Sequence, residues 1–69
     1  MYKYYFVDVL FDNGLAVLGE EKSYLDFSEV AAEFTKYVTD PACRNCVFSY
    51  YDSKGTRRIL LEYTRPEDL

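Results

Sequence analysis

Two cysteines form the motif with the clearest chemical potential, Cys43-Arg44-Asn45-Cys46. Thiolates at this spacing supply half of a zinc site or the two sulfurs of a redox dithiol. A structural zinc site needs four soft or nitrogen ligands, and the chain contains two cysteines and no histidine. One chain therefore cannot complete such a site, although two chains of a dimer could share one.

The redox interpretation of this pair meets an electrostatic objection. In thioredoxin-like sites the first cysteine lies at a helix N-terminus, where the helix dipole lowers the thiol pKa. Here the pair follows a predicted helix, so the negative helix end and Asp40 oppose thiolate formation, and Arg44 offsets them only in part. We interpret Cys43 and Cys46 as structural residues. An intersubunit metal site and a redox role are the alternatives.

Carboxylates form the second candidate group, and they gather in the first half of the chain: Glu20, Glu21, Asp26, Glu29 and Glu33. Glu29 and Glu33 lie one helical turn apart, so they could chelate a hard cation or act as an acid–base pair. As a group the carboxylates could also imitate phosphates and occupy a basic groove on a partner. The alternative is a solvated helix face, with Asp26 and Glu29 placed favourably against the N-terminal helix dipole.

Basic side chains near the last predicted turn, Lys54, Arg57 and Arg58, follow Tyr50 and Tyr51. Basic and aromatic groups together can clamp single-stranded nucleic acid. The net charge of −4, however, repels phosphate at long range. We therefore expect no direct nucleic-acid binding and interpret these residues as a charged strand edge that discourages aggregation.

The residue types give no indication of catalytic machinery. No histidine is available as a neutral-pH acid or base. The serines consequently have no histidine to activate them, and no glycine-rich phosphate loop is present. We predict that the protein is not an enzyme and needs no cofactor.

Four strands and one helix must position these groups. Aromatic and β-branched residues predict a strand over Lys3–Phe11, whose odd-numbered residues form the better core face. Asp12-Asn13-Gly14 predicts a hairpin turn. A second strand is expected at residues 15–18, fading into residues 19–22.

A helix is predicted next, because Asp26 and Glu29 form a capping box. Its apolar residues follow helical spacing and comprise Phe27, Val30, Ala31, Phe34, Tyr37 and Val38. Pro41 ends it. We then expect a loop that contains both cysteines, a strand at 47–51, a turn at 52–55, a strand at 56–64 and a polar tail.

This order, β-β-α-β-β, predicts a single α+β domain over residues 1–69 with a four-stranded antiparallel sheet and one helix packed on one face. One helix covers only part of such a sheet, so the opposite face should expose apolar side chains. A large exposed apolar patch usually marks an interface. The candidates for that face are Phe6, Leu10, Leu18 and Tyr51.

Composition predicts a folded domain, and the short apolar segments predict a cytoplasmic location. The chain is 49% hydrophobic and 19% aromatic, which favours a folded domain over disorder. The apolar start of the chain is interrupted by Asp8 and is too short to span a bilayer. We expect a cytoplasmic protein with reduced thiols and no membrane partner.

These observations together predict a small acidic, non-enzymatic protein-interaction module. Its partner is expected to be a basic protein that meets the acidic residues, or a second copy that meets the open sheet face. Such a protein suits a stoichiometric inhibitor of a nucleic-acid-handling complex, and it is similar to small phage-encoded anti-defence and anti-CRISPR proteins in size and charge alone. The alternatives are a metal- or redox-responsive regulator using Cys43 and Cys46, or a structural subunit of a larger assembly.

Overall fold

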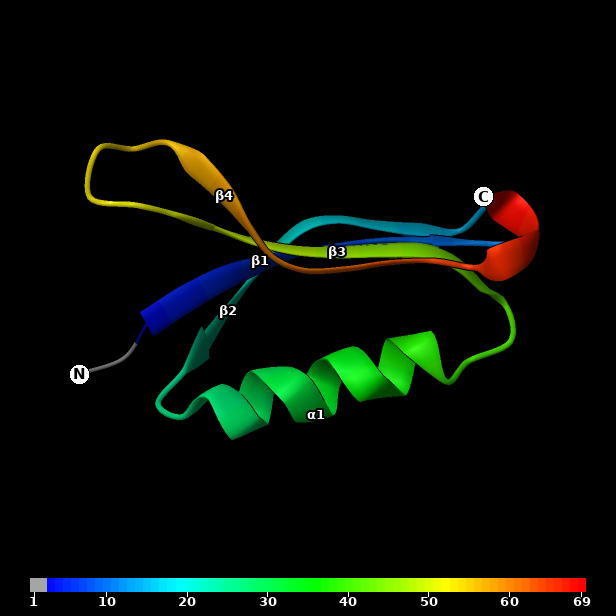
Figure 1. Cartoon of the computed structure of the whole chain (residues 1–69), viewed down its shortest axis with the longest axis horizontal. Coiled ribbons are helices and arrows are strands. Elements are labelled where there is room, and N and C mark those ends of the chain that lie inside the picture. The colour runs from blue at the N-terminus through cyan, green and yellow to red at the C-terminus, as the bar shows by residue number, and fades with distance from the viewer. Residues whose placement is uncertain (1–2) are drawn as a thin grey trace.

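The computed structural model describes residues 3–69 and shows two antiparallel hairpins joined by a helix (Figure 1). This arrangement confirms the predicted β-β-α-β-β order and the α+β class. The elements in chain order are β1 (Lys3–Phe11), β2 (Ala16–Tyr24), α1 (Phe27–Val38), β3 (Cys43–Tyr51), β4 (Arg57–Thr64) and a short 3-10 helix, η1 (Pro66–Asp68).

The four strands form one antiparallel sheet in the order β2-β1-β3-β4. The first strand of each hairpin is therefore central, and the second strand of each is an edge. Helix α1 runs along one face of the sheet (Figure 1), and no other element among residues 3–69 forms a layer on the opposite face. We call that opposite side the uncovered face.

The core lies between α1 and the two central strands. The predicted core face of β1 is confirmed, since Tyr5, Val7 and Val9 are at most 3% exposed. Phe48 of β3 is fully buried at the centre. Three rings surround it, those of Tyr5, Phe34 and Tyr37, with centroid distances of 5.1, 5.1 and 6.2 Å. Aromatic packing of this kind lets a small domain bury a large apolar area per residue.

The predicted capping box begins α1. Asp26 accepts a hydrogen bond from the Ser28 backbone N–H at 3.0 Å, and Glu29 accepts one from the Asp26 N–H at 2.9 Å. These bonds satisfy N–H groups that have no partner within the helix. Phe27, which the spacing placed on the apolar stripe, is 48% exposed. The fully buried part of the stripe is Val30 alone.

Strand β2 is longer than predicted and continues to Tyr24. Its polar residues Glu20, Glu21 and Lys22 have low strand propensity, but they pair with β1 residue for residue. Pairing with a central strand overrides the local preference here. One irregularity interrupts the ladder opposite Asp8, whose carboxylate accepts a hydrogen bond from the Gly19 N–H at 3.0 Å.

The predicted cysteine-containing loop is wrong, because β3 begins at Cys43 and includes both cysteines. Residues three apart in a regular strand point to opposite faces. An irregularity in the β1–β3 ladder, between the pairs made by Leu10 and Phe11, adds one residue to β3. Cys43 and Cys46 therefore both enter the core.

Candidate functional site

The uncovered face carries most of the large apolar side chains that the fold leaves exposed. Strand register identifies it, because Phe6 pairs with Ser49 and Ser49 pairs with Ile59, while the neighbouring Val7 and Phe48 pair in the core. The exposed members are Tyr4 at 55%, Leu10 at 39%, Leu18 at 81%, Tyr51 at 56% and Ile59 at 53%.

The candidates Phe6, Leu10, Leu18 and Tyr51 all lie on this face by strand register and alternation. Ile59 was not among them. In a regular strand Ile59 and Leu61 would share a face, but β4 has one extra residue between them. Leu61 consequently pairs with Phe48 in the core, and Ile59 faces outward. The sequence contains no glycine or proline here that would have signalled the bulge.

Charged groups are few on the uncovered face. Arg57 of β4 reaches across β3 to Asp8 of β1, with an N–O distance of 3.3 Å. Glu21 on β2 pairs with Phe6, and Glu62 on β4 pairs with Val47, so both carboxylates lie on this face, one on each edge strand. Neither has an ion-pair partner among residues 3–69. The face is thus apolar with unpaired negative charge at its edges.

The five acidic candidates do not form one surface. Glu20 and Glu33 lie on the helix side of the sheet and both pair with Lys22, at 3.5 and 3.2 Å. Glu33 also pairs with Lys36 at 3.4 Å. Burial alone would raise the pKa of Glu33, but hydrogen bonds from the two lysines outweigh it and lower that pKa below the ordinary value.

The remaining acidic candidates have other positions. Glu29 accepts hydrogen bonds from the backbone N–H groups of Leu25 and Asp26, at 2.8 and 2.9 Å. Asp26 caps the same helix. Glu21 lies on the uncovered face. Because cap bonds and lysine pairs engage four of these carboxylates, only Glu21 is free to meet a basic partner without breaking a contact within residues 3–69.

The basic candidates are also partly neutralised. Arg57 pairs with Asp8, and Arg58 pairs with Asp52 at 3.1 Å. The Asp52 carboxylate further accepts hydrogen bonds from the Lys54 and Thr56 backbone N–H groups, both at 2.9 Å. These contacts hold the turn between β3 and β4 and leave a weak footprint for phosphate.

Cys43 and Cys46 are both fully buried. Burial raises the pKa of both thiols, that of Cys46 to about 12, with the Cys43 sulfur and Asp8 adding to the effect on Cys46. A buried neutral thiol is a poor nucleophile, and neither cysteine is exposed to a second chain in this conformation. Within residues 3–69 no cluster of three metal-ligating side chains occurs.

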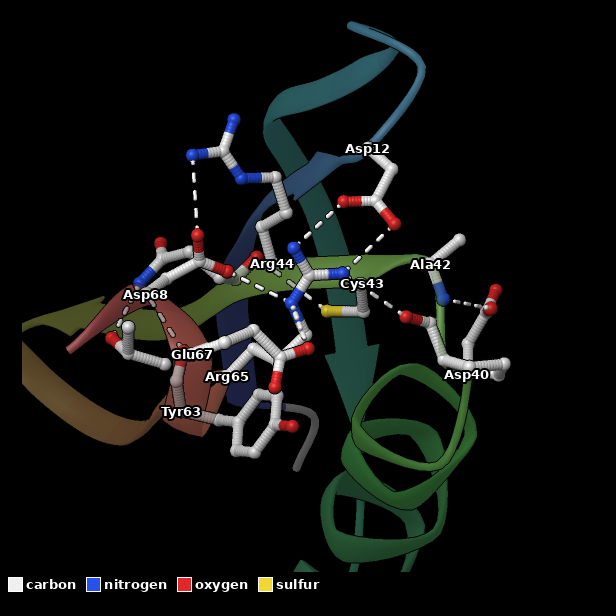
Figure 2. Close-up of polar contacts among 12 residues, drawn as sticks. Asp12, Asp40, Ala42, Cys43, Arg44, Tyr63, Arg65, Glu67 and Asp68 are labelled. Carbon is white, nitrogen blue, oxygen red and sulfur yellow. Dashed lines mark hydrogen bonds and ion pairs between the residues drawn. The ribbon is translucent and has the colours of Figure 1, made fainter.

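The end of the sheet that carries the β1–β2 turn contains an arginine cluster that the sequence did not reveal (Figure 2). The sequence predicts a polar tail for the C-terminal segment, but its Arg65 side chain is only 17% exposed and contacts three other parts of the chain. Its guanidinium donates to Asp12 at 2.8 Å, to Asp68 at 2.9 Å and to the Pro41 carbonyl at 3.3 Å. The cluster joins the first hairpin turn, the α1–β3 connection and the C-terminal helix, so we assign it a structural role.

At the opposite end the two hairpins diverge (Figure 1). The β1–β3 ladder runs only from the Phe6–Ser49 pair to the Phe11–Cys43 pair. Beyond Phe6 a cavity of about 630 Å³ opens between the strand ends. Its described lining, which defines the fork cavity, consists of Lys3, Tyr4, Phe6, Tyr24, Tyr50, Tyr51 and Leu60.

Two further findings complete the description of the site. Among residues 3–69, no helix combines the length and the apolar composition that crossing a membrane requires. Comparisons of the chain with protein-family models, with curated proteins and with solved structures find no match.

Proposed function

We propose that this protein is a non-enzymatic protein-interaction module that binds a protein partner through its uncovered face. The observation that supports this proposal is the concentration of exposed large apolar side chains on the side opposite α1: Tyr4, Leu10, Leu18, Tyr51 and Ile59. Contiguous apolar surface on a small domain favours an interface, because water contact with it is unfavourable.

The charges on this face indicate the chemistry of the partner. Glu21 and Glu62 have no ion-pair partner among residues 3–69 and lie on opposite edge strands. A partner with an apolar centre and flanking lysine or arginine side chains would complement them. Two copies packed face to face would bring four such carboxylates together. Arg57, which lies on this face, is already paired with Asp8 and would not neutralise them. We therefore favour a basic heterologous partner over a homodimer.

Within this proposal, the first class of partner to test is a protein that binds nucleic acid, with its nucleic-acid-binding surface as the contact. Such surfaces combine basic groups with aromatic or apolar platforms on which bases stack. A bound acidic protein would exclude the nucleic acid, which is stoichiometric inhibition without catalysis. The net charge of −4 supports this class of partner.

The experiment is a tagged pull-down from cells that express the protein, with three variants compared. Leu18→Asp and Ile59→Asp place a charge on the uncovered face, at positions 81% and 53% exposed. Leu25→Asp is the matched control. Leu25 is also exposed, at 59%, but it lies beyond the end of β2 and immediately before the cap of α1, so a charge there does not alter the sheet. We expect the first two variants to lose a partner that wild type and Leu25→Asp retain.

Two further readouts sharpen this test. Charge reversal at Glu21 and Glu62 should weaken the same complex and reduce its sensitivity to salt. Light scattering of the purified protein reports self-association directly. If a dimer forms and Leu18→Asp or Ile59→Asp dissociates it, the heterologous partner is wrong and a second copy occupies the face. Equal capture by all variants would contradict the proposed surface.

A further inference from the structure

We infer that the fork cavity binds a small organic anion with a flat aromatic body. This goes beyond the proposed function, because it concerns a different class of ligand and a recess that shares Tyr4, Phe6 and Tyr51 with the uncovered face but also includes Lys3, Tyr24, Tyr50 and Leu60. The cavity measures about 630 Å³, which lies within the range of about 300–1,000 Å³ typical of small-molecule sites. Its size therefore fits a small organic molecule.

The walls of the cavity suit an aromatic ligand. Five of the seven described lining residues are aromatic, and Leu60 adds an aliphatic contact. Two of the rings are held in place by edge-to-face packing: Tyr51 on Phe6 with centroids 5.3 Å apart, and Tyr24 on Tyr5 with centroids 5.6 Å apart. Rings fixed in this way offer faces and edges for a flat guest with little loss of conformational entropy on binding.

The charge of the lining favours an anionic ligand. Among the described lining residues only Lys3 is charged, and no carboxylate contributes to the wall. A negative ligand group in the fork would therefore meet one ammonium and no carboxylate among the described lining residues. A cation would face the reverse situation. Aromatic cages that bind quaternary ammonium groups have no positive charge in their walls. The fork cavity differs from such a cage because Lys3 is part of its lining.

The site exists because the hairpins separate. Past the Phe6–Ser49 pair, β1 and β3 no longer pair with each other, while Lys3 still pairs with Tyr24 of β2 and Tyr51 still pairs with Arg57 of β4. Each hairpin therefore holds its own wall. A ligand bridging Lys3 and Tyr51 would link the two hairpins where the sheet itself does not.

The test uses 2-naphthoate as the anionic probe and 2-naphthamide as its neutral counterpart, with the isolated protein followed by ¹H–¹⁵N NMR. We expect saturable naphthoate shifts at about millimolar concentration, confined to the amides at the fork and sparing those around Arg65. Naphthamide should bind about fivefold more weakly. Lys3→Gln should remove that difference, and Lys54→Gln, the matched loss of a turn lysine outside the cavity, should leave it unchanged.

Three results would overturn the inference: no saturable shifts, shifts spread over the whole surface, or equal affinity for the two probes. The measurement needs no protein partner, so its failure would leave the proposed function untouched. In the same way, Leu18→Asp and Ile59→Asp, which lie outside the cavity lining, should retain naphthoate binding even where they abolish a protein complex.

Discussion

The rings of Phe6 and Tyr51 pack edge to face, with their centroids 5.3 Å apart and their planes at 79°. Phe6 belongs to the last pair of the β1–β3 ladder, and Tyr51 lies beyond it. This contact therefore closes the apex of the fork from the side of the uncovered face. The proposed protein interface and the proposed ligand cavity share it, although one is a surface and the other a recess.

The core position of Phe34 predicts a large loss of stability on truncation. Its ring packs edge to face on the fully buried Phe48, with centroids 5.1 Å apart. Phe34→Ala should lower the free energy of unfolding by about 3 kcal/mol, measured by urea denaturation. The matched control is Phe27→Ala on the same helix, where the ring is 48% exposed, and it should cost no more than about 1 kcal/mol. Equal losses would contradict the assigned helix face.

Burial of the two thiols predicts slow chemical modification. Cys43 and Cys46 are fully buried, and burial raises the pKa of Cys46 to about 12. The native protein at pH 8 should react with DTNB only as fast as it unfolds, and should react at once in urea. Ser53→Cys, which puts a thiol in the exposed β3–β4 turn, is the control and should react immediately. Rapid labelling of the wild type would support the redox alternative.

Two aspartates predict loss of stability in acid. The pKa of Asp12 is lowered by its hydrogen bond from Arg65, and the pKa of Asp52 is lowered chiefly by its hydrogen bond from the Thr56 N–H. Both contribute stability above their ordinary value of 3.8, and that contribution disappears as the pH falls through the lower folded values. The melting temperature should drop between about pH 5 and pH 2. Asp52→Asn should flatten this drop, and identical slopes would contradict the assignment.

The cap formed by Glu29 predicts that this carboxylate matters for folding. It accepts hydrogen bonds from the Leu25 and Asp26 backbone N–H groups, at 2.8 and 2.9 Å. Glu29→Ala should lower the free energy of unfolding by about 1 kcal/mol. Glu29→Gln retains an acceptor oxygen and should lose less. If both variants match wild type in urea denaturation, Glu29 is a solvated surface residue rather than a cap.

Local chemistry made much of the fold predictable. The Asp26–Glu29 capping box, the aromatic alternation of β1 and the glycine of the β3–β4 turn each act within a few residues, so the sequence alone indicates them. The α+β class and the existence of an uncovered face follow from that order of elements. For the same reason Phe6, Leu10, Leu18 and Tyr51 could be named as candidates for that face.

Features that depend on distant pairing could not be predicted. Strand β2 continues through Glu20, Glu21 and Lys22 only because β1 pairs with it. Bulges move Cys43 into the core beside Cys46 and turn Ile59 outward. Arg65 meets Asp12 across 53 residues of chain.

The sequence by itself thus determined which elements form, because hydrogen bonds and apolar spacing within a short segment decide that. The tertiary structure alone decided which face Cys43 and Ile59 join and where the hairpins part. A single extra residue in a strand reverses the direction of every side chain beyond it, and neither β3 nor β4 contains a glycine or proline that records where that residue lies.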